Sequence, residues 1–297
     1  MGDKAERIRI ELLTEDGPGG GAAVPRAQWQ ELLTEGTEPG GDPAGGTRRW
    51  LARDGGDPVG AAWLLPDGRF RVTVAAERSG GGADAALLDA VRSAAVAQGS
   101  AALLTSAVKD SADESRLAAA GFRPGEETLR MLLRVDSCDP AALRAVVRAA
   151  SDGYHLVRWQ GVAPSDLVGP YRATRTALDI PPVEPVVRGY TRLTVAALGL
   201  DPLGDEVVAG FSEILLPGGA DATRALQSDT AVLEQHRGHG LGLWVKAAML
   251  QWLLGAHPEV TEVETVCRTG NRHMIEINEG LGFRPAGREV PYQLALP

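Results

Sequence analysis

A glycine-rich turn between a strand-like run and a helix-like run constrains the fold of this chain more than any other feature. Residues 226–233 have the composition of a strand, residues 235–242 read QHRGHGLG, and residues 241–254 form an apolar, helix-like run. Glycines let backbone N–H groups approach an anion closely, and a helix N-terminus adds a favourable dipole. The segment therefore predicts an α/β fold with a turn that can hold a pyrophosphate.

The spacing of the glycines separates this turn from two other phosphate-binding motifs. No Gly-Lys-Ser/Thr follows, as it does in nucleotide-triphosphate loops, and the third glycine of the dinucleotide fingerprint is missing. The turn has the pattern Gln/Arg-x-x-Gly-x-Gly, with Gln235, Gly238 and Gly240 in place. This pattern resembles the acyl-coenzyme A loop of the GCN5-related N-acetyltransferase (GNAT) superfamily.

The sequence after the turn has further elements in the order typical of that superfamily. Residues 260–266 alternate like a strand, Asn271 begins a helix-like segment, and Gly282 and Phe283 end it. The resemblance implies a mixed, twisted β-sheet flanked by helices. It also implies acetyl-CoA as a co-substrate, with no metal.

The tetrapeptide Gly-Phe-Arg-Pro occurs twice in the chain, at residues 121–124 and 282–285. Each copy precedes a short strand-like tail, at residues 128–135 and 291–296. A repeated tetrapeptide followed by the same kind of element indicates two copies of one structural unit.

The glycine turn also has an earlier copy, because Gly80 and Gly82 precede an apolar helix-like run at residues 83–97. Two units of domain size indicate a tandem duplication rather than a solenoid. We therefore predict an α/β fold of two tandem GNAT-like domains, each a mixed twisted β-sheet flanked by helices. Residues 1–136 form a degenerate N-terminal domain, and residues 137–297 form a C-terminal domain with the acetyl-CoA site.

The first copy departs from the superfamily pattern at three positions. Glu77 stands where the pattern has Gln or Arg, and a carboxylate repels a neighbouring pyrophosphate. Asp110 occupies the position of the Asn, and Leu117 that of a Tyr. A shift of one residue restores the pattern from Arg78 onward, so a second acyl-CoA site in the first domain remains open.

The resemblance implies two groups of cofactor-binding residues in the second domain. Val232 and Leu233 offer backbone groups to the pantetheine arm, and Asn271 bonds the same arm or caps its own helix. The pyrophosphate lies against the residues of the turn, which are Arg237, Gly238, His239, Gly240, Leu241 and Gly242.

Catalysis needs a carboxylate on a strand, because an amine near pH 7 is protonated and must lose a proton before it attacks a thioester. Glu213 is the first candidate for this general base and Asp229 the second, although either can equally be a solvent-facing strand residue. Asn278 occupies the position of a Tyr that acts as general acid in many members. A carboxamide cannot be that acid but can hydrogen-bond a sulfur, and Tyr292 is an alternative acid.

Three other groups are expected to be structural. Lys246 interrupts the apolar helix at residues 241–254, and its amine is expected to reach the surface from the edge of the core. His236 and His239 are three residues apart but have no cysteine or carboxylate at ligand spacing, so no metal is expected. Cys267 is expected to be a buried thiol.

Composition excludes several kinds of partner. The 297-residue chain has a net charge of −9 and no basic arm, which argues against nucleic acid. No apolar run is long enough to span a membrane, and the N-terminus lacks a signal-peptide pattern. Two cysteines are too few for a disulfide scaffold. We expect a cytoplasmic monomer or homodimer.

The resemblance implies an N-acetyltransferase that transfers acetyl from acetyl-CoA to a primary amine of a small molecule by direct attack. One alternative is a non-catalytic acyl-CoA-binding sensor or scaffold. Another is a protein N-acetyltransferase. An open groove would favour a protein acceptor, whereas a closed acidic pocket would favour a small amine.

Overall fold

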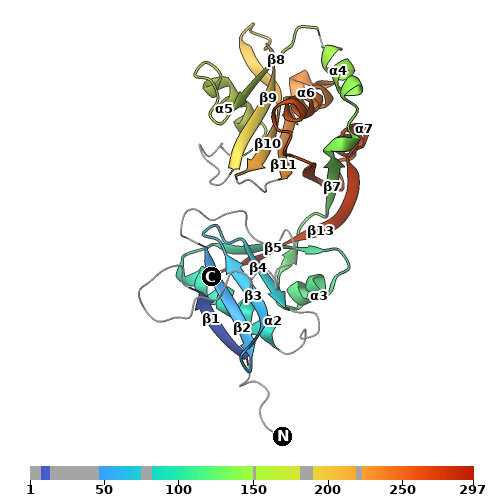
Figure 1. Ribbon diagram of the computed structural model, residues 1–297. Helices are drawn as coiled ribbons and strands as arrows, with labels where there is room; N and C mark the ends of the chain where they lie inside the picture. The colour runs from blue at the N-terminus through green and yellow to red at the C-terminus, as the bar shows by residue number, and fades with distance from the viewer. Residues whose placement is uncertain (1–7, 14–46, 75–81, 150–151, 181–189, 219–222) are drawn as a thin grey trace. The chain divides into compact units, whose positions relative to one another are not determined.

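The computed structural model describes residues 8–13, 47–74, 82–149, 152–180, 190–218 and 223–297 (Figure 1). The earlier glycine turn, with Glu77, Arg78 and Gly80, lies outside these residues. The chain divides into two compact units by its contacts. The first unit comprises residues 1–126 and 289–297, and the second comprises residues 127–288.

The first unit contains an antiparallel sheet whose strands follow chain order. The strands are β1 (Ile8–Leu13), β2 (Arg48–Asp54), β3 (Asp57–Leu64) and β4 (Phe70–Val74). The elements that follow are α2 (Ala83–Ala97), β5 (Ala102–Val108), α3 (Ala112–Ala119) and β6 (Arg123–Pro124). The helix α2 has the bounds that the apolar run predicts, and its buried side chains Leu87 and Val91 pack into the core of this unit.

The second unit is built around a larger mixed sheet. Its strands are β7 (Thr128–Arg134), β8 (His155–Gln160), β9 (Tyr190–Leu200), β10 (Glu206–Pro217), β11 (Arg224–Val232), β12 (Glu262–Arg268) and the start of β13 (Arg284–Ala295). Their order across the sheet is β13-β7-β12-β11-β10-β9-β8. The helices are α4 (Pro140–Arg148), α5 (Val168–Ala177), α6 (Leu241–Ala256) and α7 (Arg272–Gly280).

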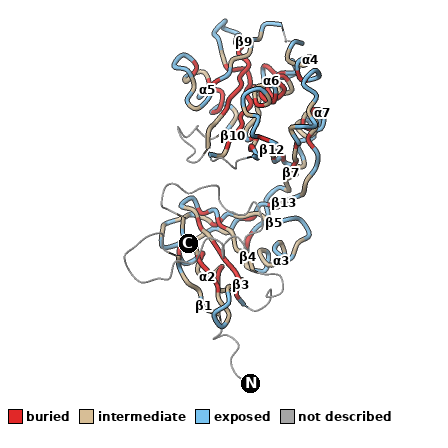
Figure 2. The backbone as a smooth tube through the Cα atoms, viewed as in Figure 1, coloured by how far each residue is buried: buried red, intermediate tan, exposed pale blue. Residues whose placement is uncertain are grey.

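Helices cover both faces of this sheet. Leu193 and Val195 of β9 share a core with α4 and α6, whereas Ala196 and Leu198 pack with Tyr171 of α5. Figure 1 shows α5 and α6 on opposite sides of β9, and Figure 2 shows buried backbone along β9, β10 and α6. Alternate residues of a strand point to opposite faces, so one strand contributes to both cores. Among the described helices, none is long and apolar enough to cross a membrane.

The two strand-like tails that follow the repeated tetrapeptide are exchanged between the units. β7 follows the first tetrapeptide but pairs antiparallel with β12, from Arg134–Glu262 to Thr128–Arg268. β13 begins within the second tetrapeptide, at Arg284, and its residues Glu289–Ala295 pair with β5. The division by contacts therefore falls ten residues before the predicted boundary at residue 136 and moves the last nine residues to the first unit.

The exchange predicts that the C-terminal strand stabilises the first unit. Val290 is 4% exposed in the core that contains Leu103 of β5, whereas Val266 of β12 is 55% exposed. Val290→Ala should lower the free energy of unfolding of the first unit by about 2 kcal/mol, because it leaves a cavity. Val266→Ala is the matched control and should change stability little.

Amide hydrogen exchange locates this effect. Val290→Ala should accelerate exchange at residues 103–107 of β5, with β12 unchanged. Accelerated exchange in β12 with an unaffected β5 would show that β13 pairs within its own half of the chain instead.

Candidate active site

Strands β11 and β12 begin as a parallel pair and then separate. Their register ends at Gln227–Thr265, whereas β11 continues to Val232 in register with β10. β12 continues in register with β7 on its other side. Backbone groups near the carboxyl end of β11 that face away from β10 therefore have no partner strand in this register.

A β-bulge shapes the same segment of β11. The register with β10 shifts between Ser212 and Ile214, so that Ser228 and Asp229 lie opposite the single residue Glu213. A bulge bends its strand, increases its twist and re-aims side chains. We attribute the separation of β11 from β12 to this bulge, which also sets the direction of Asp229.

The glycine turn has the geometry that its sequence predicts. Gly238 and Gly240 have φ angles of +84° and +71°, a region that side-chain-bearing residues rarely adopt. A Cβ at either position would have no protein atom within 4 Å, so the space over the turn is open. Gly240 is the N-cap of α6, and no side chain caps this helix. The N–H groups of the first turn are therefore available to an anion.

Leu233 and Val232, which precede the turn, differ in the hydrogen bonds of their backbone groups. The N–H of Leu233 donates to Ala209 O at 2.9 Å, so it is already bonded to β10. By the alternation of an antiparallel ladder, the N–H and C=O of Val232 point away from β10. The carbonyl of Val232 accepts from Arg237 Nε at 3.3 Å. The N–H of Leu233 is therefore used within the sheet, whereas the backbone of Val232 faces away from β10.

At the start of α6, Leu241 points into the core and Gly242 has no side chain, so these two residues offer only backbone groups to the glycine turn. Leu241 is buried in the core, and Gly242 lies where a Cβ would be 3.4 Å from Ile277 Cδ1 of α7. Asn271 caps α7, and its Oδ1 accepts from the Met274 N–H at 3.2 Å. The cap role is thus present, and it leaves the Nδ2 group of Asn271 exposed.

Tyr154 contacts two histidines of the glycine turn. The buried His236 ring lies with Nδ1 3.0 Å from the Tyr154 hydroxyl, and burial lowers the pKa of His236. His239 is exposed, with its ring 5.4 Å from that of Tyr154. Within the described parts of the chain, no group of three or more metal-ligating side chains contains either histidine. The contact with Tyr154 holds His236 in place, and burial disfavours the charged form of its ring.

Glu213, the first candidate for general base, lies inside an ion cluster. Its side chain is only 2% exposed. It accepts from the Tyr171 hydroxyl at 2.5 Å and from Arg175 Nη1 at 2.8 Å, and Arg192 Nε lies 3.3 Å away. Burial beside Glu213 raises the pKa of Tyr171. A carboxylate held by two guanidinium groups and shielded from solvent is poorly suited to remove a proton from a substrate.

Asp229, the second candidate, is the accessible end of the same cluster. Its Oδ2 accepts from Arg175 Nη2 at 3.0 Å, and its side chain is 42% exposed. Arg175 therefore joins the buried carboxylate to the exposed one. Tyr171 and Arg175 were missed by the sequence analysis, although a buried Tyr and Arg one helical turn apart are a signal of such a cluster.

Asn278 and Lys246 are both buried in the second unit. Asn278 is 0% exposed, and its Nδ2 donates to the sulfurs of Cys267 and Met131 at 3.1 and 3.7 Å. The structure thus gives Asn278 a place in the core, where its amide already bonds protein sulfurs. The prediction that the Lys246 amine reaches the surface is wrong, because Lys246 is 1% exposed and its Nζ lies 5.5 Å from the centroid of the Phe283 ring.

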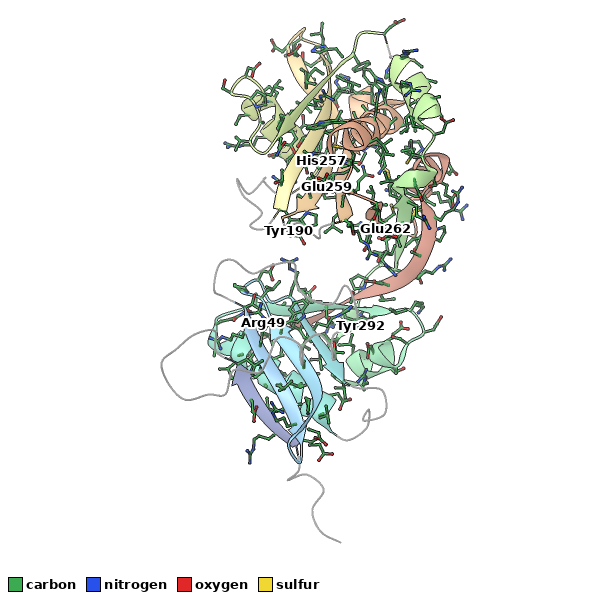
Figure 3. All side chains as sticks on the ribbon, viewed as in Figure 1. Arg49, Tyr190, His257, Glu259, Glu262 and Tyr292 are labelled. Carbon is green, nitrogen blue, oxygen red and sulfur yellow. The ribbon has the colours of Figure 1, made fainter. Side chains whose placement is uncertain are left out.

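Tyr292, the alternative acid, belongs to the first unit. It pairs with Thr105 of β5, and its hydroxyl donates to Glu114 at 3.2 Å. Figure 3 labels Tyr292 among the side chains of that unit. The strand exchange therefore removes Tyr292 from the second domain to which the sequence analysis assigned it.

The first unit has a counterpart of the glycine turn with different electrostatics. Gly82 is the N-cap of α2 with a φ of +86°, and no side chain caps this helix either. Asp84 lies in the first turn of α2, whereas α6 has no acidic residue there. A cavity of about 330 Å³ beside this helix is lined by Asp84, Asp113 and Arg116, and Arg116 is ion-paired with both carboxylates.

The second unit is an α/β fold in which two separating strands lie beside a glycine-capped helix, and comparisons with solved structures show which proteins share this fold. A tandem GNAT protein from the clavulanic acid biosynthesis pathway is 26% identical, with 97% of this chain and 98% of that chain covered and a TM-score of 0.70. The chain is a tandem member of the GNAT superfamily.

Two more distant structures share the fold. A GNAT protein from Sphaerobacter thermophilus is 16% identical, with 83% of this chain and 80% of that chain covered and a TM-score of 0.59. One from Kribbella flavida is 15% identical, with 79% and 87% covered and a TM-score of 0.56. No family profile and no curated protein sequence matches the chain.

The burial of Lys246 predicts a pH-dependent stability. Burial lowers the pKa of Lys246 from 10.5 to about 7. Between these values the unfolded chain binds more protons than the folded chain, so the contribution of this residue to stability rises with pH. Lys246→Met should raise the free energy of unfolding on the order of 2 kcal/mol at pH 7, and the gain should shrink toward pH 10.

Denaturant unfolding at several pH values measures this gain. Lys109→Met, at an exposed lysine, is the control and should show no comparable gain. A gain for Lys246→Met that is the same at pH 7 and pH 10 would contradict the lowered pKa.

Proposed function

We propose that this protein is an acyl-CoA-dependent N-acetyltransferase that acetylates a primary amine of a small molecule by direct attack, with the chemistry in the second unit. One observation carries the proposal: three features that an acetyltransferase needs lie close together in the sequence. They are a helix that begins at a glycine without a side-chain cap, the end of a strand that has separated from its neighbour, and a carboxylate that is partly exposed. These are Gly240 of α6, Val232 of β11 and Asp229 of β11.

The residues of the turn fit an acyl-CoA molecule. The open space over Gly238 and Gly240 would admit a pyrophosphate against the N–H groups of α6, and Arg237 would add charge-assisted hydrogen bonds. Val232 would bond the pantetheine arm through its backbone, and Asn271 through its free Nδ2. Acyl-CoA supplies the activated acyl group as a thioester.

The protein's own part in the reaction is to remove a proton and to orient the reactants. Asp229 would take the proton of the acceptor ammonium, directly or through a water. Glu213 is then a positioning residue, since it holds Arg175, which in turn holds Asp229. The N–H of Val232 would donate to the carbonyl oxygen where negative charge develops. Asn278 has no role in this proposal.

The first unit is proposed not to bind acyl-CoA. Asp84 in the first turn of α2 opposes the approach of phosphate to that helix, and no such charge is present on α6. Binding without thiol release would favour the alternative of an acyl-CoA sensor. Thiol release with a peptide but with no small amine would favour a protein acetyltransferase.

Substitution of the N-cap glycine tests the cofactor site. Gly240→Glu should abolish acetyl-CoA binding, because a carboxylate then occupies the space proposed for phosphate. Gly204→Glu is the matched control: Gly204 has a φ of +90° and open space around its Cβ, so the backbone strain is similar. Calorimetric titration should find one site per chain in the wild type and in Gly204→Glu. Equal affinity in Gly240→Glu would refute the site, and two wild-type sites would show that the first unit also binds.

Substitution of the two carboxylates tests the base. Asp229→Asn should lower kcat about 100-fold or more with little change in stability, because it removes the proton acceptor but keeps the shape of the side chain. Glu213→Gln should destabilise the fold by roughly 3 kcal/mol, because Arg175 and Arg192 lose their shared buried carboxylate. Asp166→Asn, at an exposed aspartate before α5, is the control for both.

Steady-state thiol release and thermal unfolding separate these effects. Full activity in Asp229→Asn, or an inactive Glu213→Gln of unchanged stability, would reverse the assignment of the two carboxylates.

A further inference from the structure

A second cavity of the second unit lies on the α5 face of the sheet. It has a volume of about 410 Å³. Its walls combine Trp159 of β8, Val162 of the following loop and Tyr171 of α5 with three arginines, Arg172, Arg175 and Arg192. Arg175 also holds Asp229, so the cavity and the proposed base share one guanidinium group.

The charge of this cavity is opposite to that of the chain. The protein has a net charge of −9. Among the described residues that line the cavity, three are arginines and none is acidic. Arg172 is exposed, and its guanidinium forms no ion pair with any described residue. A cluster of this kind is suited to an anion, and it does not fit the acidic pocket that a simple amine acceptor would favour.

We propose that this cavity binds a carboxylate carried by the acceptor, so that the substrate is an amine with an acid group at the far end of a short apolar or aromatic skeleton. The identification of the ligand as the acceptor rests on the proposed function, whereas the cavity and its charge do not depend on it. Arg172 is the specificity-determining residue and receives the carboxylate, in the bidentate geometry that guanidinium groups favour.

A single carboxylate fits better than a phosphate for two reasons. Glu213 and Asp229 already share Arg175 and Arg192, which leaves one net positive charge among these described groups. The remaining wall is apolar: the Trp159 ring stands edge-on to Tyr171 at 5.3 Å, and Val162 is largely exposed. Apolar walls beside one charge favour an amphipathic ligand over a strongly hydrated dianion.

The ion cluster connects the cavity wall to the proposed base through Arg175. Arg175 bonds the buried Glu213 and the more exposed Asp229, and it also forms part of the cavity wall. An acceptor anchored by its carboxylate at Arg172 would extend along this wall, and its amine would point toward Asp229. The cavity would thus orient the acceptor for attack.

Binding of a carboxylate probe tests the cavity without the reaction. The probes are phenylacetate, its neutral analogue phenylacetamide and inorganic phosphate, each titrated by calorimetry into the full-length chain. Phenylacetate should bind the wild type, and phenylacetamide at least tenfold more weakly. Arg172→Gln should weaken phenylacetate at least tenfold, and Arg172→Lys should restore part of the loss. Arg144→Gln, at an exposed helical arginine of α4, should bind like the wild type.

Thiol release with a matched pair of amines tests the link to the acceptor. The pair is 4-(aminomethyl)benzoate and benzylamine, which differ only in the carboxylate. The wild type should prefer the carboxylated amine, and Arg172→Gln should reduce the ratio of the two kcat/KM values at least tenfold. A preference that survives in Arg172→Gln would overturn the inference, as would phenylacetate binding that is absent or independent of Arg172.

The outcomes separate this inference from the proposed function. Arg172-dependent binding of phenylacetate with no thiol release from any amine would support the anion site and refute the transferase. Thiol release that is the same with and without the carboxylate on the amine would support the transferase and refute the anion site. Arg172-dependent binding of phosphate without binding of phenylacetate would overturn the assignment to a carboxylate.

Discussion

The β-bulge opposite Glu213 is the constraint on which the functional half of the second unit depends. Two residues of β11 face one residue of β10 there, and β11 leaves β12 within the same segment. Beyond this point Asp229 contacts Arg175 of α5, the backbone of Val232 faces away from β10, and the glycine turn follows. Without the bulge, β11 and β12 could remain paired along their length, and the groups proposed to hold the thioester would be hydrogen-bonded within the sheet.

Local signals predicted the local structure well. The bounds of α2, the start of α6 at Leu241 and the cap at Asn271 all follow from apolar runs and helix-start residues. The choice of partner strands could not be predicted in this way. β7 follows the first tetrapeptide and β13 begins within the second, and neither local pattern specifies the partner strand. Only the complete set of contacts assigns β13 to β5, and with it Tyr292.

The same limit applies to the candidate site. Alternation along a strand predicts the face on which Glu213 lies but not which residues cover that face. In the structure, Arg175 of α5 lies over it and bonds Glu213. A sequence pattern also does not show how deeply a residue is buried, which is why the amine of Lys246 was expected at the surface. Most of its neighbours along α6 are apolar and buried, with Gln251 as an exposed polar exception. The position of Lys246 on a largely buried helix therefore decides its burial, even though its amine favours water.

The two units show how a duplicated turn can diverge while its backbone is retained. Gly82 and Gly240 have nearly the same φ, and each caps a long helix without help from a side chain. What differs is the charge of the first helical turn, where Asp84 stands in one copy and no acid in the other. A single carboxylate at this position opposes the helix dipole's attraction for phosphate but costs the helix nothing, since acids stabilise helix N-termini. The acidic residue proposed to prevent anion binding by the first copy is therefore compatible with a stable helix.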